Sequence, residues 1–558
     1  MINRIKGSNY KAFKEFDFEI KPLTILLGAN SCGKSALINI LLMFSQTCES
    51  LDVAEVPLRL NGSRVGLGES LNIIRNKDSK NILSFSFYFE NQRRLDSENK
   101  RQRNKRLHSL IRFYSSAFSF IMRRCLNSNS DLYKKYSDLL MEYGDFFAFE
   151  NSDFKSHIYN LGNALKEIIP EFNKITPRKS NLPSVLSHYL KAVDVREFDY
   201  LYNNIDNINS EDKTNVHGVR YDFKIRNDDG SQEIMLVALL DKHGDEIISI
   251  EKTKNKEFDF KSDLFKLKEN EYLINSLKRR INFESLNIIN DKRMDRDNYS
   301  FLTDVTAGVG MYIEKFVADA TYMFIREFNG NNINHVSPLR AFPQRYYLLD
   351  KSIHHEQLDA LNGIELAEVL KKNAAILDKI NKLFSIFNIY ITIQKTNDII
   401  HRIVVNQNAV ELELTDVGFG ISQVLPILVQ AYLSPKNSIT IIEQPEIHLN
   451  PKMQAWLIDA IISISLNESK NFIIETHSET IIRRLRLRIV DQNSKLTPSN
   501  LNIYHLERNN NDGTTDLNKA TIDTTGDLIW PKEFMDINAQ DLLEIQKMKF
   551  DMKNKEKH

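Results

Sequence analysis

The chain has 558 residues, a length that predicts about three or four domain-sized units. Its 74 Lys and Arg residues balance 74 Asp and Glu residues, which excludes both a general nucleic-acid coat and an acidic-tail protein. Hydrophobic residues make up 42% of the chain, which excludes collagen-like and wholly disordered classes.

The first elements predicted along the chain are short strands, then a loop and a helix. Residues 1–20 contain alternating apolar and aromatic positions, and the apolar run at 23–27 predicts a buried strand that leads into Gly28. Residues 36–44 are largely apolar and free of Gly and Pro, which predicts a helix. The order is therefore strand, loop, helix.

Strand and helix signals then alternate in long blocks. Strands are predicted at 82–90, 219–226, 234–241 and 246–251, with hairpin turns at 227–230 and 242–244. Hairpin-like runs follow at 389–394 and 403–414. We divide the chain into an N-terminal lobe (1–91) with its β-meander (216–253), a helical insertion (92–215), a second insertion (254–332), a C-terminal lobe (333–535), and a C-terminal helix and tail (536–558).

Cysteine usage and apolar runs indicate the compartment. Cys32, Cys48 and Cys125 show no metal-ligand spacing and cannot form a paired framework, which predicts a reducing environment. The longest apolar run, 234–240, is far shorter than the roughly 20 residues that span a bilayer. Met1 leads directly into strand-like sequence without an export leader. We expect a cytoplasmic protein with no membrane segment.

The loop between the predicted strand and helix fits the pattern G-x-x-x-x-G-K-[ST]. Its residues are Gly28, Ala29, Asn30, Ser31, Cys32, Gly33, Lys34 and Ser35. In such a loop the backbone N–H groups surround the β- and γ-phosphates, Lys34 supplies a positive charge, and Ser35 supplies a Mg²⁺ ligand. A glycine-rich turn without a ligand is the alternative, and the flanking strand and helix disfavour it.

Two further predicted strands end in polar residues. The run 438–442 is followed by Glu443, whose carboxylate can hold Mg²⁺, although an acidic strand end is also common on solvated surface. The strand at 471–475 is followed by His477. These strand ends predict one edge of a doubly wound sheet.

In this order the motifs resemble those of the ABC-type ATPase heads of the RecF, OLD and structural-maintenance-of-chromosomes group. Residues 28–35 resemble Walker A, 439–443 resemble Walker B, and His477 resembles the switch histidine. Residues 416–423 resemble the signature loop, although they could simply start a helix. The resemblance implies that this loop binds the partner's nucleotide through Asp416, Gly418, Gly420 and Ser422.

The resemblance also implies a fold and a set of ligands. It implies an α/β fold, an ABC-type ATPase head with a P-loop doubly wound sheet and an antiparallel β lobe, with large, mainly helical insertions. ATP and Mg²⁺ are the implied cofactors, with Ser35 and Glu443 as metal ligands. A homodimer or higher homo-oligomer around ATP is the implied assembly. Residues 335–347 and 530–534 resemble two further segments of the same branch.

One position departs from this group. Gln444 follows Glu443, where such heads usually have a glutamate that polarises water, and Gln can orient water but cannot take its proton. Glu446 is a candidate substitute, and slow hydrolysis is the alternative. Gln46 is either a metal-sensing residue or a helix-end residue that faces water. The predicted catalytic residues are Lys34, Glu443, Gln444, Glu446 and His477.

Residues 93–124 form a strongly basic stretch, with ten Lys or Arg and two acids. This charge density suits contact with nucleic-acid phosphates, and a solvated helix face is an equal alternative. The predicted contacts are Lys100, Arg101, Arg103, Lys105 and Arg106. The arginines at 483, 484, 486 and 488 could contact DNA, but pairing with acids is favoured.

The segment after His477 contains no acidic cluster typical of a metal nuclease. This architecture resembles the PtuA-type ATPases of Septu and retron anti-phage defence systems. The resemblance implies a separate HNH-type (PtuB-like) nuclease partner, and DNA or an RNA–DNA hybrid with a reverse transcriptase. The alternatives are a nucleotide-bound sensor scaffold without turnover, a RecF-like DNA repair ATPase, and a transporter ATPase subunit, which the long interruptions disfavour.

Overall fold

The computed structural model describes most of the chain. The described residues are 1–49, 57–89, 92–124, 126–143, 153–175, 196–226, 228–253, 258–262, 264–265, 277, 281–289, 308–340, 343–348, 366–396, 400–408, 410–529 and 544–549. They belong to two compact units. The first unit comprises residues 1–49, 60–78 and 327–558, and the second comprises 50–59 and 79–326.

A seven-stranded sheet organises the first unit, with the order β18-β17-β16-β3-β15-β14-β9. The strands are β3 (Leu23–Gly28), β9 (Ile333–Val336), β14 (Ile439–Glu443), β15 (Asn471–Glu475), β16 (Leu501–Arg508), β17 (Thr515–Ile522) and β18 (Leu528–Ile529). The five strands from β16 to β9 are parallel, and β17 and β18 extend the sheet antiparallel. This order confirms the predicted doubly wound arrangement, because strands distant in sequence lie side by side.

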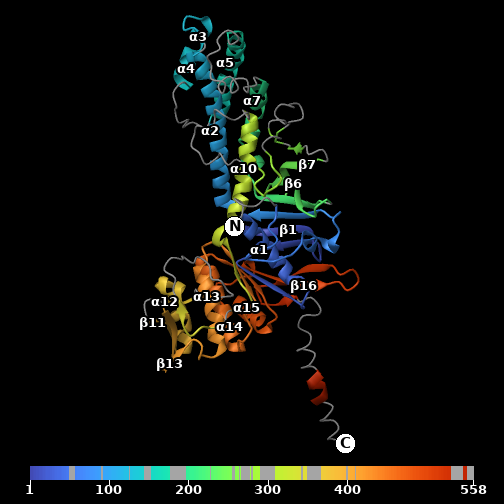
Figure 1. Ribbon diagram of the computed structural model, residues 1–558, viewed down its shortest axis with the longest axis vertical. Helices are drawn as coiled ribbons and strands as arrows, with labels where there is room; N and C mark the ends of the chain where they lie inside the picture. The colour runs from blue at the N-terminus through green and yellow to red at the C-terminus, as the bar shows by residue number, and fades with distance from the viewer. Residues whose placement is uncertain are drawn as a thin grey trace. The chain divides into compact units, whose positions relative to one another are not determined.

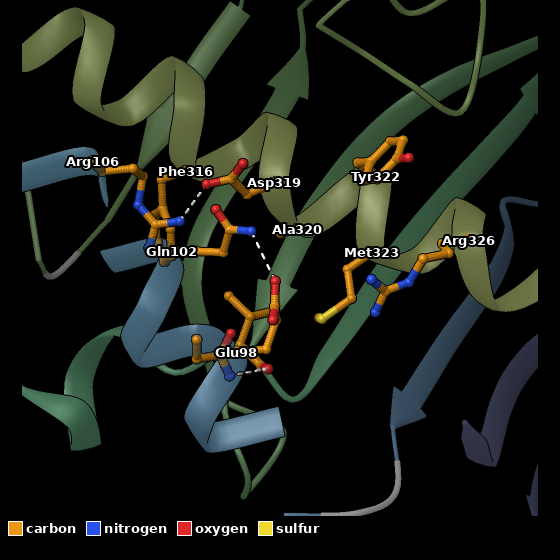
Figure 2. Close-up of a pocket in the computed structure, with 11 residues that line it drawn as sticks. Glu98, Gln102, Arg106, Phe316, Asp319, Ala320, Tyr322, Met323 and Arg326 are labelled. Carbon is orange, nitrogen blue, oxygen red and sulfur yellow. Dashed lines mark hydrogen bonds and ion pairs between the residues drawn. The ribbon is translucent and has the colours of Figure 1, made fainter. Parts of the chain in front are cut away.

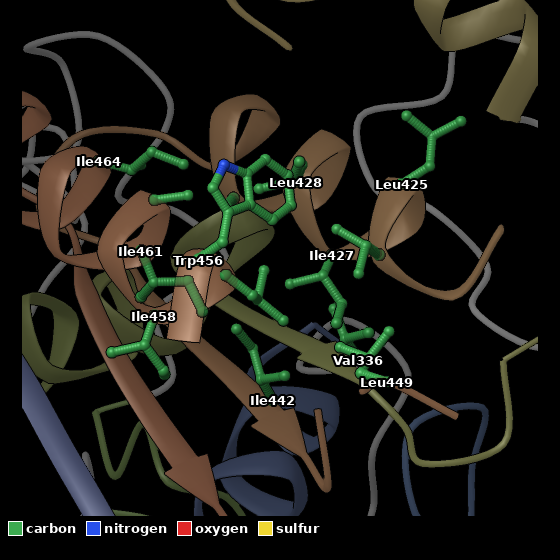
Figure 3. Close-up of a cluster of buried hydrophobic side chains, with 14 of the residues drawn as sticks. Val336, Leu425, Ile427, Leu428, Ile442, Leu449, Trp456, Ile458, Ile461 and Ile464 are labelled. Carbon is green, nitrogen blue, oxygen red and sulfur yellow. The ribbon is translucent and has the colours of Figure 1, made fainter. Parts of the chain in front are cut away.

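Helices cover this sheet and bury its apolar strands. They are α1 (Lys34–Cys48), α13 (Phe419–Leu433), α14 (Pro451–Glu468) and α15 (Glu479–Val490). Two further helices, α11 (Leu366–Lys372) and α12 (Ala374–Phe384), pack against α13 and against strands of a smaller sheet. Figure 3 shows Trp456 and Ile461 of α14 and Leu428 of α13 gathered around Ile442 of β14. Each such side chain stabilises the fold by roughly 1.5–3 kcal/mol on burial. Continuous apolar runs therefore predicted these strands correctly, because a strand that is covered on both faces exposes neither face to solvent.

A smaller antiparallel sheet and a hairpin complete the first unit. The sheet contains β10 (Tyr347–Leu348), β11 (Ile389–Lys395), β12 (Ile400–Gln407) and β13 (Val410–Glu413), and Figure 1 shows α12 beside β11. The hairpin consists of β1 (Ile2–Tyr10) and β2 (Phe13–Glu19). The predicted hairpin-like runs at 389–394 and 403–414 are confirmed as β11 and as β12 with β13.

The second unit combines antiparallel strands with helices. Its strands are β4 (Leu83–Phe89), β5 (Gly218–Ile225), β6 (Gln232–Leu240), β7 (Glu246–Lys252) and β8 (Phe258–Lys261). Its helices are α2 (Gln92–Arg124), α3 (Asp131–Lys135), α4 (Ser137–Tyr143), α5 (Phe154–Ile175), α7 (Arg196–Ile208), α8 (Glu211–Thr214) and α10 (Val309–Phe328), whose last turn crosses the unit boundary. The helical character predicted for 92–215 is confirmed in its described residues.

Some predictions fall outside this description. Cys125, the segment 530–534 and the tail from 551 lie outside the described residues. The compact units group β4 with the later strands rather than with β3, so the predicted lobe boundaries stay a prediction. Among the helices that the structure describes, none is both long enough and apolar enough to cross a membrane.

Candidate functional site

The loop between β3 and α1 requires its two glycines. Gly28 has φ +140°, and a Cβ there would lie 2.4 Å from the carbonyl oxygen of Leu506 and 2.7 Å from Cys32 Sγ. Gly33 caps α1 with φ 107°. Both values lie in the region that L side chains rarely adopt. Residues 29–31 between them are exposed, so their N–H groups can meet a ligand.

Lys34 lies beneath this loop. Its side chain is 4% exposed, and Nζ donates hydrogen bonds to the carbonyl oxygens of Gly28, at 3.0 Å, and Ala29, at 2.9 Å. The same Nζ lies 3.8 Å from Glu475 Oε1. Ser35, the next residue, is exposed at the start of α1. Two of the three ammonium N–H donors are used by carbonyl oxygens, so the third is available to a phosphate group.

Thr515, which is distant in sequence, supports the loop between β3 and α1. Thr515 Oγ1 donates a hydrogen bond to the Cys32 carbonyl oxygen at 2.9 Å, and the Thr515 N–H donates to the Ala12 carbonyl oxygen at 2.9 Å. A Cβ at Gly33 would lie 3.2 Å from the Phe13 ring. The loop thus rests on the β1–β2 turn and on the start of β17.

Glu443 ends β14, and two residues near β9 hold it. His335 Nε2 lies 2.6 Å from Glu443 Oε1. Arg340 Nη2 donates to the carbonyl oxygens of Glu443, at 2.9 Å, and Gln444, at 3.3 Å. The sequence placed both residues in a resembling segment, without assigning them to the site.

Gln444 and Glu446 occupy the turn after β14. Gln444 has φ 43°, and its N–H donates to the Glu475 carbonyl oxygen at 2.7 Å. The Glu446 carboxylate accepts hydrogen bonds from Thr476 Oγ1 and from the His477 N–H, both at 2.8 Å. Both oxygens of Glu446 therefore hold the loop after β15, which makes Glu446 a positioning residue for this loop, and its role as a substitute base stays a prediction.

The carboxyl ends of the parallel strands bring the predicted groups together. Glu443 and Glu475 are paired in register across β14 and β15, and Glu475 is paired with Leu26 of β3. His477 follows directly and is exposed. Burial, with the Lys34 charge as a second cause, lowers the pKa of His477 below its usual range. Its imidazole is therefore neutral near pH 7 and is a hydrogen-bonding rather than a charged group.

Glu475 is a site residue that the sequence did not reveal. It is 5% exposed, and its Oε2 has no hydrogen-bond partner in the part of the chain that the structure describes. Burial, with the neighbouring Glu443 carboxylate, raises the pKa of Glu475 to about 7, although Lys34 and Ser35 act in the opposite direction. No motif marks this position. The only signal is an acid at the end of an otherwise apolar strand.

The donor atoms at this edge fit Mg²⁺. Ser35 offers a hydroxyl oxygen and Glu443 a carboxylate, and Mg²⁺ prefers hard oxygen ligands. Within the described ranges no group of three or more His, Cys, Asp or Glu side chains could hold a metal alone. In nucleotide sites Mg²⁺ usually takes one or two protein ligands together with waters and substrate phosphates.

The residues predicted for the signature loop are only partly accessible. Asp416 pairs with Arg345 at 3.2 Å, and Gly418 caps α13 with open space around its Cα. Gly420 packs near Met453. Ser422 is 3% exposed inside α13, so the expectation that its hydroxyl faces a second copy is wrong for this structure. The loop-to-helix geometry itself is as predicted.

The basic stretch on α2 divides into two faces. Lys100, Arg101 and Lys105 are exposed. Arg103 and Arg106 are only 3% and 4% exposed. The expectation that they contact nucleic acid at the surface is therefore wrong for these two arginines.

The two buried arginines are paired with acids. Arg103 lies 3.1 Å from Glu211, and Arg106 lies 2.6 Å from Asp319 of α10. Figure 2 shows the ion pair of Arg106 with Asp319. The ring centroid of Phe316 lies 4.6 Å from the Arg106 guanidinium carbon. The same helix thus uses its charge for internal pairing on one side and for solvent on the other.

The structure also gives the contacts of the arginines in α15 and of Gln46. Arg484 and Arg488 both pair with Asp459 of α14, which agrees with the favoured pairing of this arginine group with acids. Gln46 is 3% exposed, and its Oε1 accepts a hydrogen bond from the Val65 N–H at 3.1 Å. Gln46 is therefore neither water-facing nor part of the strand-end site.

Comparisons with known proteins give a family. A family model described as AAA ATPase domain (AAA_15) matches residues 1–482. A comparison with curated proteins gives no significant match.

Solved structures give a distant likeness. An SMC head bound to the C-terminal winged-helix domain of ScpA aligns at 10% identity and TM-score 0.38, covering 93% of this chain and 98% of that one. The SMC head domain of Thermotoga maritima aligns at 7% identity and TM-score 0.30, again covering 93% of this chain and 98% of that one. An SMC head with an extended coiled coil from Pyrococcus furiosus aligns at 11% and 0.32, covering 98% of this chain and 99% of that one.

Proposed function

Because the chain belongs to the AAA ATPase domain family and is a P-loop ATPase, we propose that it binds Mg–ATP at residues 28–35 and hydrolyses it slowly. The observation that carries this proposal is the position of Lys34, buried at 4% exposure beneath an exposed loop. An ammonium held by two carbonyl oxygens and one carboxylate is ready to exchange them for phosphate oxygens.

The residues of the site then have separate tasks. The N–H groups of the loop and the N-terminus of α1 bind the β- and γ-phosphates. Lys34 moves from the carbonyl oxygens to the phosphates, and Ser35 and Glu443 hold Mg²⁺. Bound Mg²⁺ neutralises charge on the β- and γ-phosphates. His477, fixed through its backbone by Glu446, is placed to donate or accept a hydrogen bond at the γ-phosphate.

Slow turnover follows from the residue after Glu443. The Gln444 amide can orient the attacking water but cannot take its proton. Glu446 accepts hydrogen bonds from Thr476 and from the His477 N–H, which stabilise its ionised form and make it a weaker base for that task. A site with this arrangement holds ATP longer than it would with a glutamate at position 444, which suits a switch.

We further propose that ATP joins two copies and that the assembly controls a separate nuclease. The motif resemblance to PtuA-type defence ATPases supports this. It points to an HNH-type, PtuB-like partner and to DNA or an RNA–DNA hybrid as ligand. The exposed Gly418 at the start of α13 supports a dimer, because it offers N–H groups to a second copy's nucleotide.

Phosphate release measures the enzymatic part of this proposal. We expect a slow rate in the wild type and a background rate in Lys34→Ala, while Lys242→Ala, an exposed lysine of the second unit, keeps the wild-type rate. A wild type that binds ATP without release above background would instead support the nucleotide-bound scaffold, which Gln444 also permits. A rate unchanged by Lys34→Ala would contradict the proposed site.

Co-purification with mass spectrometry tests the partner. An HNH-type nuclease or an RNA–DNA hybrid that elutes with the protein is the expected result. A membrane subunit in its place would support a transporter ATPase and would contradict the defence proposal.

A further inference from the structure

The site contains a histidine that no part of the proposed mechanism uses. His335 lies on β9, the edge strand beside β14, and is paired in register with Ile441. Side chains on a strand alternate between faces, so His335 shares a face with Glu443, two residues beyond Ile441. Diagonal neighbours of this kind are within reach of a long side chain. The imidazole Nε2 lies 2.6 Å from Glu443 Oε1.

The chemistry of the two groups determines which one donates the hydrogen bond. An ionised carboxylate only accepts hydrogen bonds, so Nε2 carries the proton and donates it to Oε1. The other oxygen of Glu443 stays available for a ligand. The contact therefore fixes both the rotation of the carboxylate and which oxygen faces away from β9.

The backbone at Glu443 is held independently. Arg340 is 6% exposed, and its Nη2 binds the carbonyl oxygens of Glu443 and Gln444. Burial lowers the pKa of Arg340 to about 10, so the guanidinium remains charged near pH 7. From the opposite side, the Gln444 N–H binds the Glu475 carbonyl oxygen. With the backbone fixed on both sides, His335 is the contact that sets the carboxylate's orientation.

We propose that His335 is a positioning residue that aims the free oxygen of Glu443 at the Mg²⁺ of bound ATP. The proposal rests on the proposed function, because it needs Mg–ATP to occupy the loop. Groups that orient a metal ligand without touching the metal typically change metal affinity or activity about 10- to 100-fold when removed. A contact that merely packed β9 against β14 would have no such effect on the metal.

Mn²⁺ is a suitable probe, because electron paramagnetic resonance measures its binding in the presence of ATP. This readout does not depend on ATP hydrolysis. We expect His335→Ala to weaken Mn²⁺ binding to the protein–ATP complex about tenfold or more. Affinity for ATP in EDTA should stay unchanged. His243→Ala, an exposed histidine in the turn between β6 and β7, is the matched control and should bind Mn²⁺ as the wild type does.

Two amide substitutions at position 335 distinguish a role in orienting Glu443 from a general role in stabilising the fold. The amide nitrogen of Gln extends from the backbone about as far as imidazole Nε2, whereas that of Asn stops short. His335→Gln should therefore restore Mn²⁺ affinity, and His335→Asn should not. This comparison decides the proposal even if the alanine variant fails to fold.

The outcomes are distinct. Equal or tighter Mn²⁺ binding in His335→Ala, or equal binding by the Gln and Asn variants, overturns the proposal. A wild type that binds neither ATP nor Mn²⁺–ATP overturns the proposed function as well. Normal wild-type binding with no effect at His335 overturns only this inference.

Discussion

Three carboxylates lie at the ends of β14 and β15, and their contacts give them different tasks. Glu443 is held by His335 through one carboxylate oxygen, and we propose that the other binds the metal. Glu446 holds the backbone of His477. Glu475 is buried beside Lys34. Residues of one chemical type thus differ in their contacts, and we assign them the separate roles of proposed metal ligand, support and charge partner of Lys34.

Gln444 gives a direct test of slow turnover. If water is already oriented at this position, Gln444→Glu supplies the missing proton acceptor and should raise the rate of phosphate release at least about tenfold. Glu507→Gln, a change at an exposed acid of β16, serves as control and should leave the rate unchanged. An equal or slower rate in Gln444→Glu would remove position 444 from the chemistry.

Glu475 predicts how stability changes with pH in the metal-free, nucleotide-free protein. Its pKa is about 7 when folded and near 4.5 in the unfolded chain, so the folded state binds more protons between these values. The free energy of unfolding should therefore fall as pH rises from about 5 to 7, by up to about 3 kcal/mol from this group. Urea unfolding at several pH values in EDTA measures the slope.

Glu475→Gln should flatten that slope, because an amide does not titrate in this range. Glu507→Gln should keep the wild-type slope. Identical slopes in the wild type and in Glu475→Gln would show that Glu475 ionises normally in the folded protein.

Among the elements, α2 shows how one helix divides its charges. Its exposed cations Lys100 and Arg101 lie in long surface ion pairs with Glu211 and Glu98, at 3.8 and 3.7 Å. Arg106 instead pairs closely with Asp319, an acid whose own pKa is raised by burial. Figure 1 shows α10, which carries Asp319, alongside α2 in the second unit. The buried pair joins these two helices.

The two faces of α2 should respond to mutation in different ways. The triple variant Lys100→Ala, Arg101→Ala, Lys105→Ala should weaken nucleic-acid binding and lower its salt dependence, without loss of stability. Arg106→Met should destabilise the protein by about 1–3 kcal/mol, because it removes the ion-pair partner of the half-buried Asp319. Fluorescence anisotropy at several salt concentrations and thermal unfolding measure these effects. Unchanged affinity in the triple variant would make the basic face only a solvated surface.

For the molecule as a whole, the proposed dimer depends on nucleotide. Sedimentation velocity should show a monomer without nucleotide and a dimer with Mg–ATP, and Lys34→Ala should stay monomeric. Gly418→Trp should also stay monomeric while it still binds ATP, because open space surrounds Gly418 and its φ of −48° suits any residue. Dimer formation by Gly418→Trp would exclude this loop from the interface.

How much the sequence predicted depends on whether the contacts are local. The loop at 28–35 was predictable, because glycine spacing, strand and helix lie within about twenty residues of one another. His335 and Arg340 were not, because their partners lie 108 and 103 residues further along the chain. Arg103 and Arg106 looked like surface cations for the same reason. Their burial depends on distant helices.

The positions of Glu475 and Ser422 also could not be predicted from the sequence. An acid at a strand end carries no spacing signal, and only the arrangement of β3, β15 and β14 places Glu475 against Lys34. The signature-like residues correctly predicted a helix start. They could not reveal that α13 turns Ser422 inward, since that depends on how the helix packs.

The support of the phosphate loop by β16 and Thr515 limits how the protein can be shortened. A fragment cut after residue 482, where the family match ends, would leave β3 as an unprotected sheet edge. Exposed apolar edges of this kind pair with other chains and aggregate. The loop would also lose the hydroxyl that anchors Cys32. Truncation to the recognisable ATPase region should therefore yield insoluble material, because the three strands β16, β17 and β18 of the seven-stranded sheet support the loop at residues 28–35.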